Sequence, residues 1–100
     1  MKNLLNKLDK AFENRIRLAL MSALMVNENL DFTSLKELLG LTDGNLASHL
    51  KNLENKGYIT FDKIFQDRKP LTNYRATQKG KTAFTEHLNA LEQLLKSQQR

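Results

Sequence analysis

The sequence contains no cysteine, no tryptophan and only one proline among its 100 residues. Without cysteine, neither a disulfide framework nor a thiolate metal site can form. The two histidines lie far apart in the sequence, so we expect no bound metal and no cofactor. The chain also lacks an apolar run long enough for a signal peptide or a membrane span, which predicts a cytoplasmic protein that does not contact membranes.

The residue patterns of common catalytic sites are missing as well. No Ser–His–Asp arrangement or pair of carboxylates stands out, and no glycine-rich phosphate loop follows a predicted strand. Ser48 and His49 are neighbours on a predicted helix, so their side chains point in different directions. We therefore expect no enzyme. RNA binding is a weaker alternative, because the chain lacks the exposed aromatic pairs on which single-strand readers stack bases.

Positive charge is present in excess and is unevenly distributed. The net charge is +5, from 16 Lys and Arg against 11 Asp and Glu. The segment 51–81 alone contains eight bases and three acids, and the other 69 residues balance at eight against eight. Such a patch suits a polyanion or an acidic membrane surface, although proteins that bind neither also carry an excess of this size.

Length and periodicity predict a single, mainly helical domain over residues 1–100. Apolar residues spaced by three and four predict a first helix over about 4–25, followed by a turn at 27–31. A last helix is expected over about 78–97. The composition of the whole chain, with 40% hydrophobic and 27% charged residues, is ordinary for a soluble globular protein.

A tight turn between two helices is predicted in the middle of the chain. Thr33 or Ser34 can cap a short helix, and Gly40 lies where its C-terminal cap is expected. Thr42 can then cap a second helix over about 43–56.

A β-hairpin is predicted after Gly57, which should end that second helix. Residues 58–65 and 71–76 are rich in β-branched and aromatic side chains, and a polar turn over 66–70 separates them. Thr77 can cap the last helix. The order of helix, short helix, turn, helix, hairpin and helix is that of a winged helix-turn-helix fold, mainly α with a small β-hairpin.

The second helix of the turn has one apolar and one polar side. Leu46, Leu50 and Leu53 should face the core, and the opposite side is small, polar and almost free of acid. Helix-turn-helix proteins place such a face in the major groove, where Asn pairs with adenine, Lys favours guanine or phosphate and Ser serves most bases. A solvated helix rich in Asn by chance is the alternative. The predicted DNA-binding residues here are Thr42, Asp43, Gly44, Asn45, Ser48, His49, Lys51 and Asn52.

The histidines have competing interpretations. His49 lies beside the leucine stripe, so a partly buried ring bonded to a neighbouring backbone group is as well supported as a DNA contact. His87 belongs to the apolar flank of the last helix, where packing is the better interpretation.

Arg68 and Lys69 occupy the predicted tip of the hairpin and complete the predicted DNA-binding set. The wing of a winged helix lies along the minor groove or the phosphate backbone, where Arg and Lys supply much of the affinity. Asp67 weakens the local positive field, and a simple solvated turn is the alternative.

The terminal helices predict a homodimer. The last helix carries two adjacent apolar rows, one more than is needed to dock it on a small core, and a wide exposed stripe usually marks association. The N-terminal leucines offer a surface for the partner. The predicted interface residues are Leu4, Leu5, Leu8, Phe84, Leu88, Leu91, Leu94 and Leu95.

Two stretches, LTDGNLASHLKNLENKGYI and KIFQDRKPLTNYRATQKGKTAF, closely resemble small stand-alone winged-helix transcriptional regulators related to the MarR and ArsR groups. The resemblance covers nearly the whole chain and implies a homodimer whose recognition helices enter the major groove and whose wings lie alongside. These families commonly carry Ser at the position of Ala47, and here Ser48 comes one residue later. The cysteine motif of metal-sensing ArsR proteins is absent, so metal sensing is not implied.

Together these observations predict a sequence-specific regulator of transcription that binds double-stranded DNA at an inverted repeat. Repression is the favoured mode. The alternative from a different class is a winged helix used for protein–protein contact without DNA binding.

Overall fold

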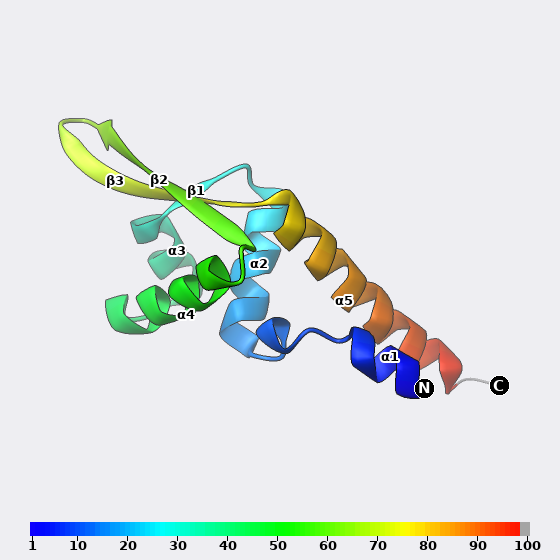
Figure 1. The fold of residues 1–100 in the computed structure, drawn as a ribbon. Helices are drawn as coiled ribbons and strands as arrows, with labels where there is room; N and C mark the ends of the chain where they lie inside the picture. Colours follow the sequence, from blue (N-terminus) through cyan, green and yellow to red (C-terminus); the bar gives the residue numbers. More distant parts are fainter. Residues whose placement is uncertain (99–100) are drawn as a thin grey trace.

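The computed structural model describes residues 1–98 as a series of helices with one small sheet (Figure 1). In chain order the elements are α1 (Lys2–Lys7), the 3-10 helix η1 (Lys10–Phe12), α2 (Arg15–Val26), β1 (Leu30–Asp31), α3 (Phe32–Leu39), α4 (Asp43–Asn55), β2 (Ile59–Gln66), β3 (Lys69–Ala76) and α5 (Gln78–Ser97). The molecule is elongated, with extents of 59, 25 and 21 Å. The β2–β3 hairpin projects from one end, and α1 packs on α5 in an arm at the other.

The N-terminal segment is broken into α1, η1 and α2, so the prediction of one helix over about 4–25 was wrong. Two short polar side chains cause the breaks. Asp9 accepts a hydrogen bond from the backbone N–H two residues later, at 2.9 Å. Asn14 accepts from the N–H groups two and three residues later, at 3.0 and 3.1 Å. Such side chains bond to the backbone in place of the helix and start a new one, which apolar periodicity alone does not reveal.

The helix-turn-helix forms from α3 and α4, and the end of α3 and both ends of α4 lie where the sequence predicts. Gly40 adopts a left-handed conformation, with φ of 63°, as the C-cap of α3. The Thr42 hydroxyl accepts a hydrogen bond from the Asn45 N–H at 3.2 Å and caps α4. Gly57, with φ of 76°, follows the end of α4. The two caps fix the turn between the helices, because each satisfies backbone groups that a helix end leaves unpaired.

The segment before α3 differs from its prediction. The N-cap of α3 is Asp31, and not Thr33 or Ser34, because its carboxylate accepts from both the N–H and the hydroxyl of Ser34, at 3.2 and 2.6 Å. This pairing lowers the pKa of Asp31. The predicted turn at 27–31 also contains strand β1, which pairs with β3 in the sheet order β1-β3-β2.

The wing is a long hairpin with a tighter turn than predicted. Instead of five residues, the turn contains only Asp67 and Arg68, both left-handed with φ of 52° and 66°. Two consecutive left-handed residues suit the twist of a two-residue hairpin. Pro70 lies in β3 opposite Phe65, beyond the part of β3 that β1 covers. The strand therefore has an open edge at Pro70, where proline is tolerated.

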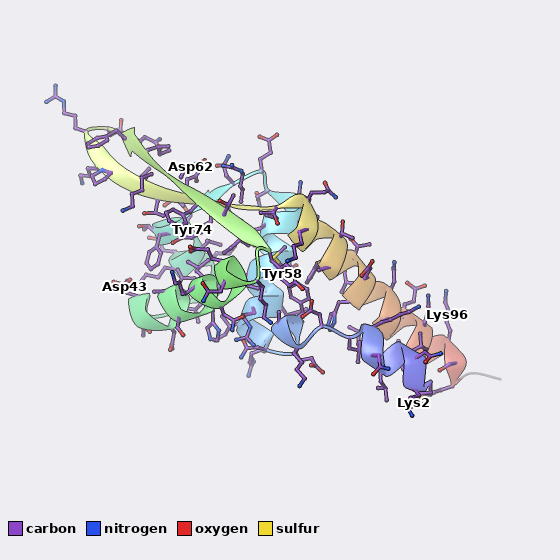
Figure 2. The ribbon with its side chains drawn as sticks, viewed as in Figure 1. Lys2, Asp43, Tyr58, Asp62, Tyr74 and Lys96 are labelled. Carbon is purple, nitrogen blue, oxygen red and sulfur yellow. The ribbon has the colours of Figure 1, made fainter. Side chains whose placement is uncertain are left out.

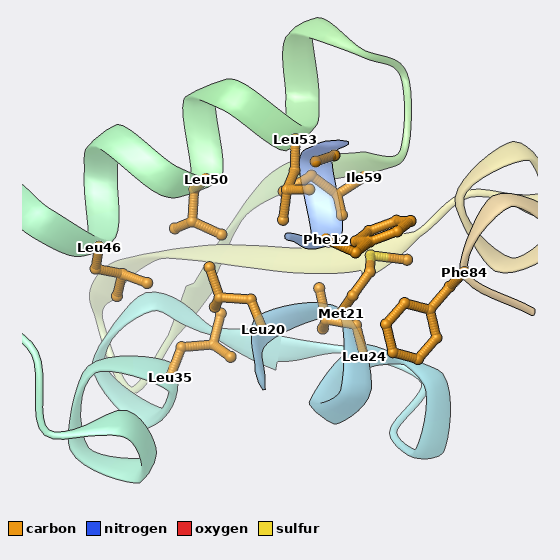
Figure 3. Close-up of a cluster of buried hydrophobic side chains, with 11 residues drawn as sticks. Phe12, Leu20, Met21, Leu24, Leu35, Leu46, Leu50, Leu53, Ile59 and Phe84 are labelled. Atoms are coloured by element: carbon orange, nitrogen blue, oxygen red, sulfur yellow. The ribbon is translucent and has the colours of Figure 1, made fainter. Parts of the chain in front are cut away.

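The core lies where α2, α3, α4 and the base of the wing meet (Figure 3). The leucines that the sequence assigns to the inner side of α4 are all buried there, which confirms that part of the prediction. The cluster comprises Ala11, Phe12, Leu20, Met21, Leu24, Leu35, Leu46, Leu50, Leu53, Ile59 and Phe84.

Tyr58, at the base of the wing, holds the arm against the body. Its hydroxyl donates to the Asp9 carboxylate at 2.5 Å, and the Asp9 N–H donates to Nδ1 of His87 at 3.0 Å. Burial, followed by the bond to Asp9, raises the pKa of Tyr58 to about 12. His87 is 3% exposed, so its predicted packing role is confirmed. Gly80 of α5 lies so close that a Cβ there would be 2.1 Å from the Tyr58 carbonyl oxygen.

Replacing Gly80 by Ala should therefore destabilise the fold by about 1–3 kcal/mol or more, because the added methyl group can be accommodated only if α5 moves away from Tyr58. Gly44→Ala is the matched control. A Cβ at Gly44 meets no atom within 4 Å, and alanine is about 1 kcal/mol better than glycine in a helix. Urea unfolding at one fixed protein concentration measures both. Equal stability of Gly80→Ala and the wild type would contradict the packing described.

Candidate nucleic-acid interface

The outward side of α4 is an accessible polar surface. Of the residues at α4 that the sequence assigns to the DNA, six are exposed to solvent, beginning at the N-terminal end of the helix. They are Thr42, Asp43, Gly44, Asn45, Ser48 and Lys51. Ala47 is also exposed, so a hydroxyl is absent at that point of the surface and is present one residue later. The surface therefore offers an amide, a hydroxyl and an ammonium group to a base edge or phosphate.

Asn52 is placed differently from the other predicted residues. It is half-buried, and its Oδ1 is shielded from solvent without a hydrogen-bond partner in the described part of the chain. In this conformation its amide oxygen is not available to a base edge, so we leave Asn52 out of the interface proposed below.

The acidic residue at the start of α4 is paired with a base. Lys36 Nζ of α3 lies 2.8 Å from Asp43 Oδ1, and the pair joins the two helices of the turn across a surface open to solvent. The carboxylate would otherwise repel a phosphate approaching the N-terminus of α4, where the helix dipole favours an anion. Lys36 reduces that repulsion, although it is not among the residues that the sequence predicts for the site.

His49 contacts a residue of α2 that the sequence analysis also missed. Arg17 Nη1 lies 3.2 Å from His49 Nδ1, and Arg17 Nε donates to the Ala11 carbonyl oxygen at 2.8 Å. A guanidinium only donates, so Nδ1 of His49 accepts and carries no proton. Burial, followed by the charge of Arg17, lowers the pKa of His49. The half-burial of the ring fits the packing interpretation, but the predicted backbone partner was wrong, because the ring bonds to the side chain of Arg17.

The wing carries bases that acids leave uncompensated. Arg75 pairs with Asp62 near the base of the wing. Among residues 1–98, Lys63, Arg68 and Lys69 have no carboxylate within ion-pair distance, and all three are exposed. Lys63 was part of the basic segment of the sequence but not of the predicted site, because its position beyond the body becomes apparent only in the folded hairpin.

The wing tip and the start of α4 lie on the same side of the molecule. In Figure 1 both are at the left, and the arm of α1 and α5 extends to the lower right. Figure 2 shows Asp43 and Asp62 on the first side and Lys2 and Lys96 at the far end of the arm. α4 and the wing therefore lie together at the end of the molecule opposite the arm.

The arm presents a second, apolar surface. Leu5, Leu88, Leu91 and Leu95 are exposed there, the last at 68%. Leu4, Leu8 and Leu94 are half-buried. The predicted interface needs one correction, because Phe84 is 4% exposed and packs edge-on against Phe12, with 5.0 Å between ring centroids. Phe84 belongs to the core and has almost no surface to offer a second copy.

The described residues were also examined for metal-ligand clusters and for helices that could span a membrane. Among residues 1–98, no three His, Asp or Glu side chains gather as metal ligands would. No helix in this range is both long enough and apolar enough to cross a membrane.

Known proteins resemble this chain in sequence and in structure. An uncharacterized protein of Methanocaldococcus jannaschii is 36% identical over 88 residues, which span 88% of this chain and 96% of the relative. A transcriptional regulator homologue from Pyrococcus horikoshii superimposes with a TM-score of 0.87 at 28% identity, over 97% of each chain. MepR of S. aureus, solved in a complex with DNA, has a TM-score of 0.74 at 18% identity, over 96% of this chain and 82% of its own.

The fold and the regulator resemblance predicted from the sequence are thereby confirmed. A family described as winged helix DNA-binding domain matches residues 16–95, from the start of α2 to near the end of α5. The chain belongs to this winged helix DNA-binding family.

Proposed function

We propose that the protein is a sequence-specific regulator of transcription that binds double-stranded DNA, with α4 in the major groove and the wing on the adjacent backbone or minor groove. The observation that carries the proposal is the shared location of two elements. α4 and the tip of the wing lie at the same end of the molecule, opposite the arm (Figure 1), and the exposed polar residues of α4 and the unpaired cations of the tip belong to these two elements. A major groove about 12 Å wide admits an α-helix, and the neighbouring phosphates then lie within reach of a wing.

Base recognition is assigned to Asn45, Ser48 and Lys51, on the outward side of α4. The backbone at Thr42 and Gly44 is suited to phosphate, because N–H groups at a helix start attract anions and Gly44 has open space around it. His49 acts through Arg17 as a packing contact that holds α4 against α2.

We further propose a homodimer formed through the arm, acting at an inverted repeat. In a monomer, the side chains of Leu5, Leu88, Leu91 and Leu95 would be exposed to water. The arm extends away from the core, so a second copy of the chain could pack on it and bury these leucines. Two-fold symmetry would place the two α4 helices in successive major grooves, about 34 Å apart. Because a regulator of transcription must have access to DNA, we propose a cytoplasmic location. Repression by occupancy of the operator is the simplest mode of regulation.

Asn45→Ala should relax base preference at one position in each half-site, by about 1–3 kcal/mol of discrimination. Binding-site selection from random DNA measures the effect. Asn89→Ala, at an exposed position of α5 in the arm, is the matched control and should return the wild-type motif. Recovery of an unchanged motif by Asn45→Ala would contradict the assignment of this residue to the groove.

Replacing Arg68 and Lys69 together by Ala should weaken binding to all DNA sequences. Each lost phosphate contact should lower the slope of log affinity against log salt by roughly one unit. The control replaces Lys2 and Lys96 by Ala, which removes the same two charges at the far end of the arm (Figure 2). If both double variants showed the same salt slope, the wing would not contact phosphate.

Leu91→Asp combined with Leu95→Asp should convert a dimer into a monomer, because two carboxylates would be buried in an apolar contact. Sedimentation at micromolar concentration measures the change. The control places Asp at Val26 and Leu38, which are also exposed apolar residues but lie on α2 and α3. A monomeric wild type, or a Leu91 and Leu95 variant that stays dimeric, would exclude this interface.

A further inference from the structure

The wing exposes an aromatic side chain that neither the fold nor the proposed base and phosphate contacts explain. Phe65 is 79% exposed, although it lies only two residues from the hairpin turn in a strand of regular pairing. Complete burial of such a side chain would be worth about 1.5–3 kcal/mol, so leaving it in water forgoes stabilisation. A partner that covers Phe65 would recover it.

The register of the hairpin explains how Phe65 is placed. Side chains alternate between faces along a strand, so Phe65 shares a face with Phe61 and with the buried Ile59. At the base this face packs on the core, and Phe61 contacts Tyr74 with 5.8 Å between ring centroids. Residues 61–70 are all exposed, so toward the tip the same face continues without the core beneath it.

Pro70 pairs directly with Phe65 across the two strands and points to the same face. The proline ring fixes the backbone there, and the two-residue turn ends two positions before it. Phe65 is therefore presented on a stiff support, unlike an aromatic side chain in a long loop.

The charges around this apolar edge select the kind of partner. Lys63 is on the same face as Phe65, two residues toward the base, and Arg68 and Lys69 lie at the turn. Asp62 is paired with Arg75, which leaves Asp67 as the single unpaired acid of the tip among residues 1–98. An acidic polymer with an apolar component fits these groups, and DNA has both, in its phosphates and in its sugars and bases.

The backbone conformation of Arg68 also indicates that the wing tip binds a partner. Its left-handed backbone costs roughly 1–2 kcal/mol for any residue with a Cβ, and glycine would avoid that cost. A long cation at this position is thus held at the apex of the turn against local preference, beside the apolar edge.

We propose that Phe65, supported by Pro70, enters the minor groove as an apolar wedge that unstacks a base step and bends the DNA, while Lys63 and Arg68 hold the flanking phosphates. The proposal rests on the DNA-binding function proposed above and extends it, because it assigns to the wing a deformation of the duplex beyond phosphate contact. Apolar wedges of this kind kink DNA at the cost of unstacking and gain contact area in return. Deformable pyrimidine–purine steps under the wing should accordingly be preferred, without hydrogen bonds to their bases.

The experiment uses the full chain and a duplex obtained by binding-site selection, labelled at its two ends for energy transfer. Affinity at several salt concentrations and the end-to-end distance are measured for the wild type, Phe65→Ala, Phe65→Leu, Arg68→Ala and the control Val26→Ala. Val26 is 83% exposed on α2 and provides an apolar truncation outside the wing. Urea unfolding checks that Phe65→Ala, altered at an exposed position, folds as the wild type does.

The wild type should shorten the end-to-end distance. Phe65→Ala should bind about tenfold more weakly with an unchanged salt slope and should lose most of the bend. Phe65→Leu should retain most of both properties, since leucine also serves as a wedge. Arg68→Ala should instead lower the salt slope by about one unit. Val26→Ala should match the wild type.

Three outcomes would overturn the wedge. The first is a wild type that binds without bending the duplex. The second is a Phe65→Ala variant that keeps wild-type affinity and bend. The third is a Phe65→Ala variant whose only change is weaker self-association in sedimentation, which would assign Phe65 to a protein contact. Failure of the wild type to bind any selected duplex would instead reject the DNA-binding function itself, and the wedge with it.

Discussion

The close packing of α5 on the backbone of Tyr58 sets the relative positions of the wing and the arm. Gly80 allows the helix to approach the Tyr58 carbonyl more closely than any side chain would permit. Tyr58 in turn holds Asp9, and Asp9 holds His87, so the N-terminal segment, the wing base and α5 meet in one hydrogen-bonded group. The separation of the DNA-facing surface from the apolar arm depends on this junction.

The two ends of the molecule follow different physical rules. At the wing and α4, polar and cationic groups are exposed to water, and some of them form ion pairs, as Lys36 does with Asp43 and Arg75 with Asp62. At the arm, apolar side chains stay in water without such satisfaction. The first surface suits a hydrated polyanion and the second suits an apolar partner. Their spatial separation would let both partners bind at once, as the proposed dimer on DNA requires.

Local chemistry explains where sequence-based prediction succeeded and where it failed. Gly40, Thr42, Gly57 and Thr77 mark the helix ends correctly, because each acts on backbone groups within a few residues. The break at Asp9 and Asn14 was missed although its cause is equally local, because the apolar spacing continues across it and masks the caps. The N-cap at Asp31 was missed for a related reason, since Thr33 and Ser34 are also residue types that cap helix N-termini.

The sequence by itself determined the order of the elements from the helix-turn-helix to the last helix, the buried side of α4, the basic character of the hairpin and the resemblance to winged-helix regulators. These features depend on periodicity, turn chemistry and charge, all of which are properties of neighbouring residues. Only the tertiary structure decided that Phe84 is core, that His49 contacts Arg17, that Asn52 is half-buried and that Phe65 stands exposed at the wing tip. Each of these depends on which distant element packs alongside, and a single chain's periodicity carries no information about that neighbour.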